Sequence, residues 1–502
     1  MKPTKILIFI FSIMLLLGVV WCLFPAEGIA MGPINLRFPS LAEEQSPKRK
    51  EVNVDDVLER VNQSFDMTCS KNMYDSLTFF RNYLKTNPNR IYLPNDDYTY
   101  FDKLFSQMEQ AKAEHKTCRV MHYGDSQIEM DRISSVFRQR LQEMFGGSGP
   151  NMIPAIQPVA TISVSQRSSN LMRYMVYGEA SRASHNRYGV MLQFSQVNGA
   201  GSVSFTQTSH SQSYSKAKEI STVSVLLGKN SQGFTAKLKC DTIKTEPKVL
   251  NACDSVTLIT WTLPANVKRG TISFNGRAEI YAVLLDGESG VALDNVALRG
   301  CSGTIFTRSN ENIMRQSFAL LDTRFIILQF GGNRMPGIKT SSNITSYIRE
   351  LETQINYTKR TAPGATVLFI GPADMGRSYN GKMGTWRGLP ELNDSLRSMA
   401  LRNDIAYWDM FHVMGGEGSM AQWVKHKPAL AGPDYVHFTY SGAQAIGTDL
   451  AKSFLTYYDF YKLRQRVPNQ EVIDFVNRDE NEDTQYTPYW KSMPKYYPYK
   501  KY

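Results

Sequence analysis

One tripeptide in the chain places a serine in surroundings that can activate its hydroxyl for nucleophilic attack. Gly124-Asp125-Ser126 lies between a short apolar strand expected over residues 118–123 and an amphipathic helix expected over residues 128–145. A sharp turn between strand and helix lifts the hydroxyl clear of the sheet edge, and the helix N-terminus directs backbone N–H groups at a developing oxyanion. Ser126 is therefore a candidate nucleophile for acyl transfer.

A serine nucleophile needs a base within hydrogen-bond reach, and that base needs a third group to orient it. Asp434 and His437 stand three residues apart on one expected turn, just before the last long helix. The chain has only seven histidines, so one in this setting is informative. Each piece alone has a simpler explanation, because Ser126 can cap its helix and the Asp–His pair can form a capped turn. Their joint occurrence favours a catalytic set of Ser126, His437 and Asp434.

The elements around these residues predict an α/β domain that a β domain interrupts. Residues 325–330 and 366–370 are continuous apolar runs, which is typical of strands inside a parallel sheet. From about residue 155 to 290 the pattern changes to short alternating runs rich in Val, Ile, Thr and Phe. Asn-Gly pairs at 198–199 and 275–276 read as turns between them. We expect a β-sandwich or jelly roll inserted into a parallel α/β fold.

With these residues in place, the sequence resembles the SGNH (GDSL-type) hydrolases, a family of esterases with a flavodoxin-like α/β fold. Gly124-Asp125-Ser126 matches the block that carries the nucleophile, and Asp434 with His437 matches the last block. Residues 299–304 look like the second block and residues 331–333 like the third, all in family order. The resemblance implies an oxyanion hole made by the N–H groups of Ser126 and Gly303 and by the side-chain amide of Asn333.

The sequence departs from the family pattern at three positions beside these blocks. Gln127 stands where leucine usually follows the tripeptide, Arg334 stands where aspartate is common, and Phe438 replaces the usual proline. None of these changes removes a catalytic group. The family pattern gives Asp125 a structural role in fixing the loop, and it is not the acid of the triad.

The inserted β domain extends the resemblance to the exported peptidoglycan O-acetylesterases, which carry a carbohydrate-binding-module-like domain at the same place. The similarity covers about residues 118–460. It implies a serine esterase that removes O-acetyl groups from a cell-envelope glycan such as peptidoglycan, with the β domain contacting the polymer. The same site can instead pass the acetyl group to a sugar hydroxyl, as an O-acetyltransferase. A non-catalytic glycan-binding protein on this scaffold is the third alternative. The chemistry requires no cofactor and no metal.

The N-terminus predicts export from the cytoplasm. Lys2 and Lys5 precede an apolar run over residues 6–24, nearly long enough to cross a hydrocarbon core of about 30 Å. Residues 28–30 offer a passable signal-peptide cleavage site, so a cleaved signal peptide and an uncleaved signal anchor both stay open. A lipoprotein is disfavoured, because the bulky Trp21 precedes Cys22. We expect the protein to be membrane-anchored through this segment or periplasmic, in the cell envelope.

Composition limits the remaining function classes. The 502 residues carry 57 Lys+Arg against 46 Asp+Glu, a surplus of +11 that is spread along the chain. Without a basic stripe, and in an exported protein, this charge does not predict a nucleic-acid partner.

Six cysteines are too few for a disulfide scaffold, and no CxxC spacing suggests zinc. Cys240–Cys253 and Cys69–Cys118 are candidate disulfides, which would leave Cys301 as a free thiol.

We therefore expect five segments. They are a signal peptide or anchor over 1–30, a linker and helical segment over 31–117, a discontinuous hydrolase domain over 118–154 plus 291–465, an inserted β domain over 155–290, and a Tyr/Lys-rich tail over 466–502. The tail is expected to drape over the surface or remain disordered, and its tyrosines and lysines also suit contact with a glycan.

Overall fold

The computed structural model describes residues 3–23, 29–31, 34–36, 52–63, 70–178, 181–241, 243–478 and 487–496. The chain divides into a unit of residues Met1–Val52 and a unit of residues Asn53–Tyr502. The first unit holds helix α1 (Pro3–Leu23) and an antiparallel pair, β1 (Ile29–Met31) and β2 (Ile34–Leu36). Within the described ranges, no helix satisfies the length and apolarity that a membrane span requires. Most of the expected linker and Cys69 lie outside the described residues.

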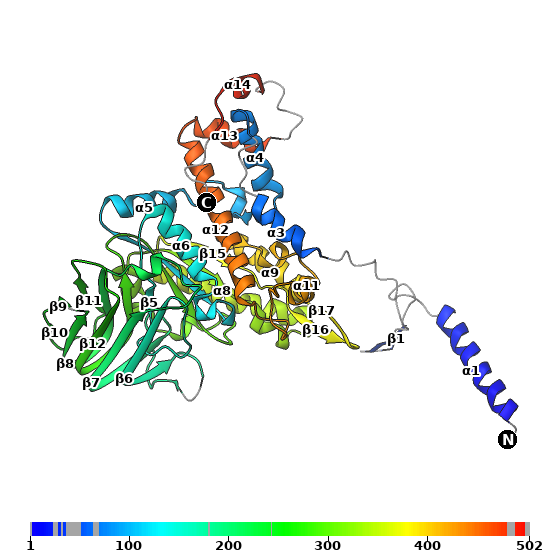
Figure 1. The fold of residues 1–502 in the computed structure, drawn as a ribbon. Coiled ribbons are helices and arrows are strands. Elements are labelled where there is room, and N and C mark those ends of the chain that lie inside the picture. Colours follow the sequence, from blue (N-terminus) through cyan, green and yellow to red (C-terminus); the bar gives the residue numbers. More distant parts are fainter. Residues whose placement is uncertain are drawn as a thin grey trace. The chain divides into compact units, whose positions relative to one another are not determined.

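A six-stranded sheet at the centre of the second unit carries the α/β fold (Figure 1). Its order is β13-β4-β14-β15-β18-β3, parallel except for the edge strand β3. Strand β4 pairs with both β13 and β14, so segments on either side of the predicted insertion share one sheet. The predicted fold class is confirmed. The strands are β3 (Ile91–Tyr92), β4 (Thr117–Gly124), β13 (Gly290–Ala297), β14 (Thr323–Gln329), β15 (Thr366–Ile370) and β18 (Ala406–Trp408).

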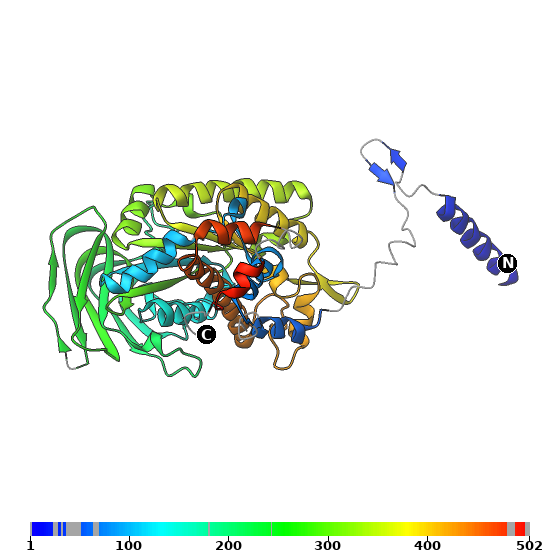
Figure 2. The same ribbon diagram turned by 90° about the horizontal axis from the view of Figure 1, so that it is seen from above.

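Two groups of helices cover the faces of this sheet (Figure 2). One group is α5 (Asp102–Ala113), α6 (Ser134–Phe145) and α12 (Tyr440–Arg464), and the other is α7 (Glu311–Leu320), α8 (Ser341–Thr361) and α9 (Leu389–Arg402). Alternate residues of β14 serve the two faces, since Phe325 stacks on Phe454 of α12 while Ile326 and Leu328 join the core beside Leu351. Because both faces are buried, the strands read as continuous apolar runs.

The inserted region is an antiparallel sheet of order β10-β8-β12-β7-β6, with β5, β9 and β11 paired alongside. Its inner face is a separate apolar cluster that includes Val225, Leu238 and Ile272. The predicted all-β character is confirmed. The strands are β5 (Asn151–Ile153), β6 (Val164–Met175), β7 (Gln193–Gln207), β8 (Thr222–Cys240), β9 (Ile243–Lys244), β10 (Lys248–Leu250), β11 (Thr257–Thr262) and β12 (Arg269–Asp286).

These strands are longer than the sequence pattern suggested. The alternating runs on either side of the Asn-Gly pair at 275–276 are both part of β12, and the Asn-Gly pairs at 198–199 and 275–276 lie inside paired strands. Gly199 and Gly276 have φ of +88° and +123°, so they bend the ladder where a hairpin turn was expected. A Cβ at Gly276 would lie 2.5 Å from the carbonyl oxygen of Gly233, so the neighbouring strand passes too close for any other residue.

A buried charge cluster joins the inserted domain to the central sheet. Arg119 of β4 contacts Asp294 of β13 at 2.7 Å and Asp286, the last residue of β12, at 2.5 Å. Asn151 also donates to Asp286, at 2.8 Å. All four residues are buried, and Asp286 lies only four residues before β13 begins. The end of the insertion is therefore fixed against the strand that leads into the candidate site.

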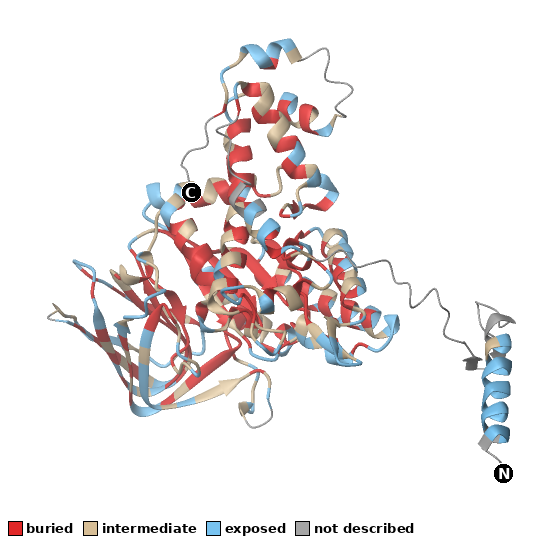
Figure 3. Cartoon of the chain, turned by 45° about the vertical axis from the view of Figure 1, so that its right-hand side comes forward, coloured by how far each residue is buried: buried red, intermediate tan, exposed pale blue. Residues whose placement is uncertain are grey.

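The described parts of the C-terminal segment pack as helices against the N-terminal ones (Figure 3). α13 (Asn469–Asn477) and α14 (Thr487–Ser492) contact α4 (Met73–Thr86), and Trp490 and Tyr496 are buried. The short helix α3 (Val54–Gln63) contacts α11 (Ser419–Lys425). A tail draped loosely over the surface is therefore the wrong description for residues 466–478 and 487–496. The expected acidic patch and the last tyrosines lie outside the described residues.

The four cysteines described in the second unit are free thiols, namely Cys118, Cys240, Cys253 and Cys301. The candidate Cys240–Cys253 disulfide is therefore wrong. Cys240 is buried at the end of β8, whereas the backbone of Cys253 pairs with that of Asn230 in the middle of the same long strand. The length of β8 separates the two positions. Cys118 is free as well, so the structure does not contain the candidate Cys69–Cys118 disulfide, and Cys69 itself lies outside the described residues.

Candidate active site

Ser126 lies at the carboxyl end of β4, directly after the turn that ends the strand. The residues that follow form a 3₁₀ turn, Ser126–Asp131, and α6 begins only at Ser134. The helix start expected at residue 128 is therefore wrong. Met130 and Asp131 have φ of +62° and +65°, values that interrupt a right-handed helix. The carboxylate of Asp131 is held in this conformation by Arg138 at 2.6 Å and by Ser163.

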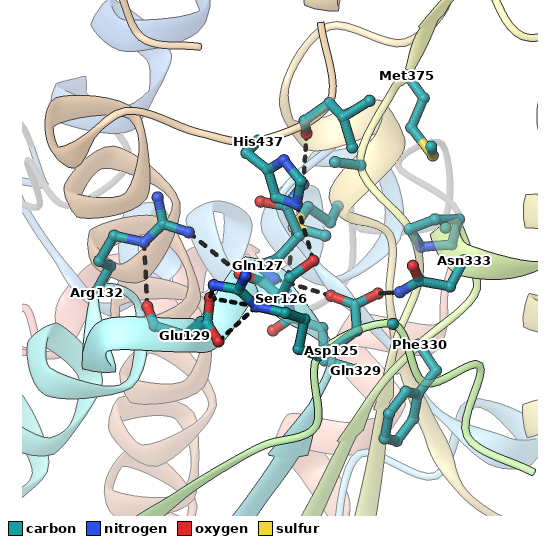
Figure 4. Close-up of a pocket in the computed structure, with 18 of the residues that line it drawn as sticks. Asp125, Ser126, Gln127, Glu129, Arg132, Gln329, Phe330, Asn333, Met375 and His437 are labelled. Atoms are coloured by element: carbon teal, nitrogen blue, oxygen red, sulfur yellow. Dashed lines mark hydrogen bonds and ion pairs between the residues drawn. The ribbon is translucent and has the colours of Figure 1, made fainter. Parts of the chain in front are cut away.

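The structure brings Ser126 together with the predicted base, His437, which arrives from a loop more than 300 residues away (Figure 4). The predicted carboxylate, Asp434, belongs to the same loop. Oγ of Ser126 lies 2.8 Å from Nε2 of His437, and Nδ1 of His437 lies 2.7 Å from Oδ2 of Asp434. In this order the carboxylate can orient the imidazole, and the imidazole can accept the serine proton.

The carboxyl of Asp434 is partly exposed and is ionised. Burial works to raise the pKa of its carboxyl, but hydrogen bonds from the His437 side chain and from the backbone N–H groups of His437 and Val436 outweigh that effect. The pKa of Asp434 therefore lies below its ordinary value, and the residue is ionised at neutral pH. An ionised Asp434 favours the tautomer in which Nδ1 carries the proton and Nε2 is free to accept one.

The two other predicted oxyanion donors are arranged differently from each other. Asn333 lines the same pocket as Ser126, and its Nδ2 donates to Oδ2 of Asp125 at 2.9 Å and to the carbonyl of Cys301 at 3.2 Å. Gly303 is not among the residues that line this pocket, and its N–H donates to Sγ of Cys301 at 3.2 Å. Asn333 therefore lies within the pocket but already donates both of its amide hydrogens, and the N–H of Gly303 is bonded to sulfur. Each donor would have to release an acceptor before it could donate to an oxyanion.

Asp125 ties the nucleophile turn to Asn333. Its Oδ1 accepts from the backbone N–H of Gln127 at 2.9 Å, and its Oδ2 accepts from Asn333. Burial raises the pKa of Asp125 to about 6, against the opposing effect of these hydrogen bonds. The carboxylate thus contacts the loop and the amide, while Asp434 is the carboxylate that contacts His437.

Two side chains that the sequence did not single out for catalysis link the serine turn to the histidine loop. Gln127 donates through Nε2 to the carbonyl of Val436 at 2.6 Å. Arg132 donates to the carbonyls of Ser126 at 3.1 Å and Phe438 at 2.6 Å, and so bridges the two loops directly. Gln127 is one of the positions that depart from the family pattern. That departure was the only signal in the sequence for the role of Gln127. The sequence contained no signal for the role of Arg132.

Replacing Gln127 by leucine, the usual residue at this position, is expected to lower kcat for a small acetate ester by about tenfold, because an ångström-scale shift of His437 weakens proton transfer. KM for the same ester should change little, because the Gln127 amide is already engaged with the carbonyl of Val436 and leucine is of similar size. Steady-state kinetics and a thermal unfolding curve measure both effects. A kcat equal to that of the wild type, with an unchanged unfolding midpoint, would show that the link does not position His437.

The pocket above Ser126 has a volume of about 550 Å³. Its inner wall is largely apolar and includes Phe330, Met375 and Met410. At its rim the guanidinium of Arg299 contacts both carboxylate oxygens of Glu129, at 2.9 and 3.1 Å for its Nε. No group of His, Cys, Asp or Glu side chains in the described part of the chain is arranged to hold a metal ion.

Residues 254–445 match the model of the GDSL-like Lipase/Acylhydrolase family. The chain carries a GDSL-like lipase/acylhydrolase domain. The matched range contains Gly303, Asn333, Asp434 and His437 but begins after Ser126, which the inserted strands separate from the rest of the domain in sequence. The prediction of an SGNH-type hydrolase is confirmed for this domain.

Of two solved structures that are similar to this chain, only the first has a TM-score above 0.5. A structure described as a peptidoglycan O-acetylesterase in action is 18% identical, with a TM-score of 0.58, and covers 72% of this chain and 96% of its own. A family two carbohydrate esterase from Cellvibrio japonicus is 10% identical, with a TM-score of 0.23, and covers 62% of this chain and 100% of its own. Comparison with curated proteins gives no match. The first similarity supports the predicted fold of an α/β domain with an inserted β domain.

Proposed function

We propose that this acylhydrolase removes O-acetyl groups from a glycan of the cell envelope, such as peptidoglycan, through an acyl-enzyme on Ser126. The observation that carries the proposal is the continuous set of contacts from Ser126 Oγ to His437 Nε2 and from His437 Nδ1 to Asp434, at the base of a pocket. The fold shared with a peptidoglycan O-acetylesterase supports the choice of substrate class.

In the first half of the reaction, Ser126 Oγ attacks the acetyl carbonyl carbon while His437 Nε2 takes the hydroxyl proton. The carbonyl oxygen becomes an oxyanion that the N–H of Ser126 and the amide of Asn333 can stabilise, each donor contributing about 10²–10³ in rate. For this the Asn333 amide releases Asp125 or the Cys301 carbonyl, and the N–H of Gly303 joins the other donors if it leaves the sulfur of Cys301. His437 then protonates the sugar oxygen, the ester C–O bond breaks, and the acetyl group remains on Ser126.

In the second half, water gives a proton to His437 and attacks the acetyl carbon, so that acetate leaves and Ser126 regains its proton. The same intermediate can be attacked by a sugar hydroxyl, which would make the enzyme an O-acetyltransferase. The apolar wall that includes Phe330 and Met375 suits a small acyl group. We further propose that the protein is exported to the envelope and that the inserted β domain contacts the polymer, as the sequence predicts.

Acetate release from O-acetylated peptidoglycan tests the proposal. The chain should release acetate in step with loss of ester from the polymer, and a Ser126→Ala variant should release none above the uncatalysed rate. Adding an unacetylated glycan and following its acetylation by mass spectrometry identifies the acceptor. Acetyl transfer to that glycan without acetate release would favour the transferase, and inactivity on every acetylated glycan tried would overturn the proposal.

A further inference from the structure

A two-stranded hairpin projects from the α/β domain (Figure 1) and is not used by the reaction described above. It consists of β16 (Gly376–Tyr379) and β17 (Lys382–Thr385), joined by Asn380-Gly381. Both joining residues have positive φ, +50° and +79°, which is the conformation of a tight two-residue hairpin turn. The hairpin is therefore a specified element of the fold.

The base of the hairpin is fixed to the walls of the pocket. Met375 lines the pocket, and its carbonyl accepts from the N–H of Trp386 at 2.8 Å (Figure 4). The N–H of Gly376 donates to the carbonyl of Tyr435, which lies between Asp434 and His437, also at 2.8 Å. A Cβ at Gly376 would lie 2.6 Å from the Cβ of Tyr435, so the contact requires glycine. A polymer with one residue in the pocket thus has the hairpin next to it.

The exposed surface of the hairpin is cationic and aromatic. Residues 376–388 carry Arg377, Lys382 and Arg387 and no acidic residue, and all three cations are exposed. The guanidinium carbon of Arg377 lies 4.9 Å from the ring centre of Trp386, and that of Arg387 lies 4.9 Å from the ring centre of Tyr379. Stacking on a ring holds each guanidinium in place while its N–H edges stay free to donate to a carboxylate.

These three cations lack the partners that other cations near the pocket have. Arg299 contacts Glu129 and Arg334 contacts Glu350, whereas none of the three hairpin cations forms an ion pair with any residue that the structure describes. Arginines that have no ion-pair partner and are held in a fixed orientation beside the pocket suit an anionic ligand.

We propose that this hairpin is a subsite for a carboxylate-bearing glycan, binding carboxylates on the part of the chain that extends from the pocket. The proposal rests on the proposed function and narrows its substrate to acidic glycans. The hairpin contributes affinity for the polymer and no group to the chemistry at Ser126. Its effect therefore appears in KM for an anionic acetylated polymer, and it is weakened by salt because the contacts are exposed.

The test compares Arg377→Gln/Lys382→Gln/Arg387→Gln with the wild type on three acetate esters. These are a small chromogenic ester, acetylated xylan as a neutral polymer, and acetylated polygalacturonate as an anionic one. We expect KM for the anionic polymer to rise about tenfold at low salt, as three exposed charge contacts would give. Activity on the small ester and on acetylated xylan should stay within about twofold of the wild type, because none of the three residues lines the pocket.

A matched control removes three exposed cations elsewhere, in Lys103→Gln/Lys112→Gln/Lys116→Gln. These residues lie on or just after α5, which leads into the start of β4 at the opposite edge of the sheet. Equal effects of the two triple variants on the anionic polymer would overturn the proposal, because net charge would then explain them. Equal losses on the neutral and anionic polymers would overturn it as well.

A binding measurement separates this proposal from the proposed reaction. Polygalacturonate without acetyl groups is titrated into the wild type and into the hairpin variant by isothermal calorimetry, which needs no catalysis. Weaker binding by the variant supports the subsite even if no acetate is released from any glycan. Equal binding by both proteins overturns it even if the esterase is active. Anionic lipid vesicles serve as a second probe, and a hairpin-dependent preference for them over the polymer would also overturn it.

Discussion

Replacing Ser126 by alanine should lower kcat for a chromogenic acetate ester by at least about 10⁴-fold, because no covalent intermediate can form. Replacing His437 by alanine should cost about as much, since Oγ of Ser126 then loses the base that lies 2.8 Å away. The double variant should be no slower than either single one, because the two residues act as one unit. Steady-state rates with a burst-phase measurement of acyl-enzyme test all three variants.

The chain itself supplies a matched control for the histidine. Asp409 and His412 repeat the same Asp-x-x-His spacing, and Nδ1 of His412 lies 2.8 Å from Oδ2 of Asp409. His412 does not line the pocket and contacts no serine in the described structure. A His412→Ala variant should therefore keep its activity within a few-fold of the wild type. Comparable losses from His412→Ala and His437→Ala would contradict the assignment of His437 as the base.

The two Asp-x-x-His pairs show what the sequence can and cannot distinguish. Spacing alone predicts a carboxylate–imidazole contact in both places, and the structure contains both. The second pair differs in its surroundings, because buried Asp409 also accepts from Asn393 and Arg397 and caps the short helix Met410–Val413. The order of motifs along the chain, with Ser126 first and Asp434 last, pointed to Asp434 and His437, and the structure places this pair beside Ser126.

The fold followed from hydrophobic patterns that depend on whole elements. Continuous apolar runs at 325–330 and 366–370 became β14 and β15, since both faces of the sheet are covered. Bends within a strand could not be predicted from hydrophobic patterns in this way. The Asn-Gly pair at 275–276 has the composition of a turn, yet long-range pairing with β7 and β8 turned it into a bend within β12. Tertiary contacts of this kind have no local signature.

The candidate site was predictable to the same degree. Ser126, Asp434 and His437 could be chosen because each has the chemistry of its role and stands beside an expected strand or helix. Asn333 was indicated only by the resemblance to the SGNH hydrolases. The 3₁₀ turn after Ser126 was missed, because it depends on Arg138 and Ser163 holding Asp131 in a left-handed conformation. The contact between Gly303 and Cys301 was missed too, since a backbone N–H gives no sequence signal for its acceptor.

Replacing Asp434 by asparagine should lower kcat/KM for the chromogenic ester by about 10²–10³-fold. A loss of about 10⁴-fold is the reference for a fully buried triad carboxylate, and the side chain of Asp434 is 51% exposed. The amide oxygen can still accept from the N–H groups of Val436 and His437, so the loop should keep its shape. The amide NH₂ group would then face Nδ1 of His437. That contact favours the tautomer with the proton on Nε2, which cannot accept a proton from Ser126.

The pH dependence of this loss separates a tautomer effect from a structural one. Because the pKa of Asp434 lies below its ordinary value of 3.8, the wild-type carboxylate stays ionised across mildly acidic, neutral and alkaline pH. The ratio of wild-type to variant kcat/KM should therefore be constant on the alkaline side of the profile, where the imidazole is neutral in both proteins. It should shrink in acid, first as the imidazole is protonated and then as Asp434 itself is protonated. An Asp409→Asn variant is the matched control and should keep wild-type kinetics on the small ester. If Asp434→Asn stays within a few-fold of wild-type kcat/KM, or if its loss follows a fall in thermal stability, Asp434 does not orient His437.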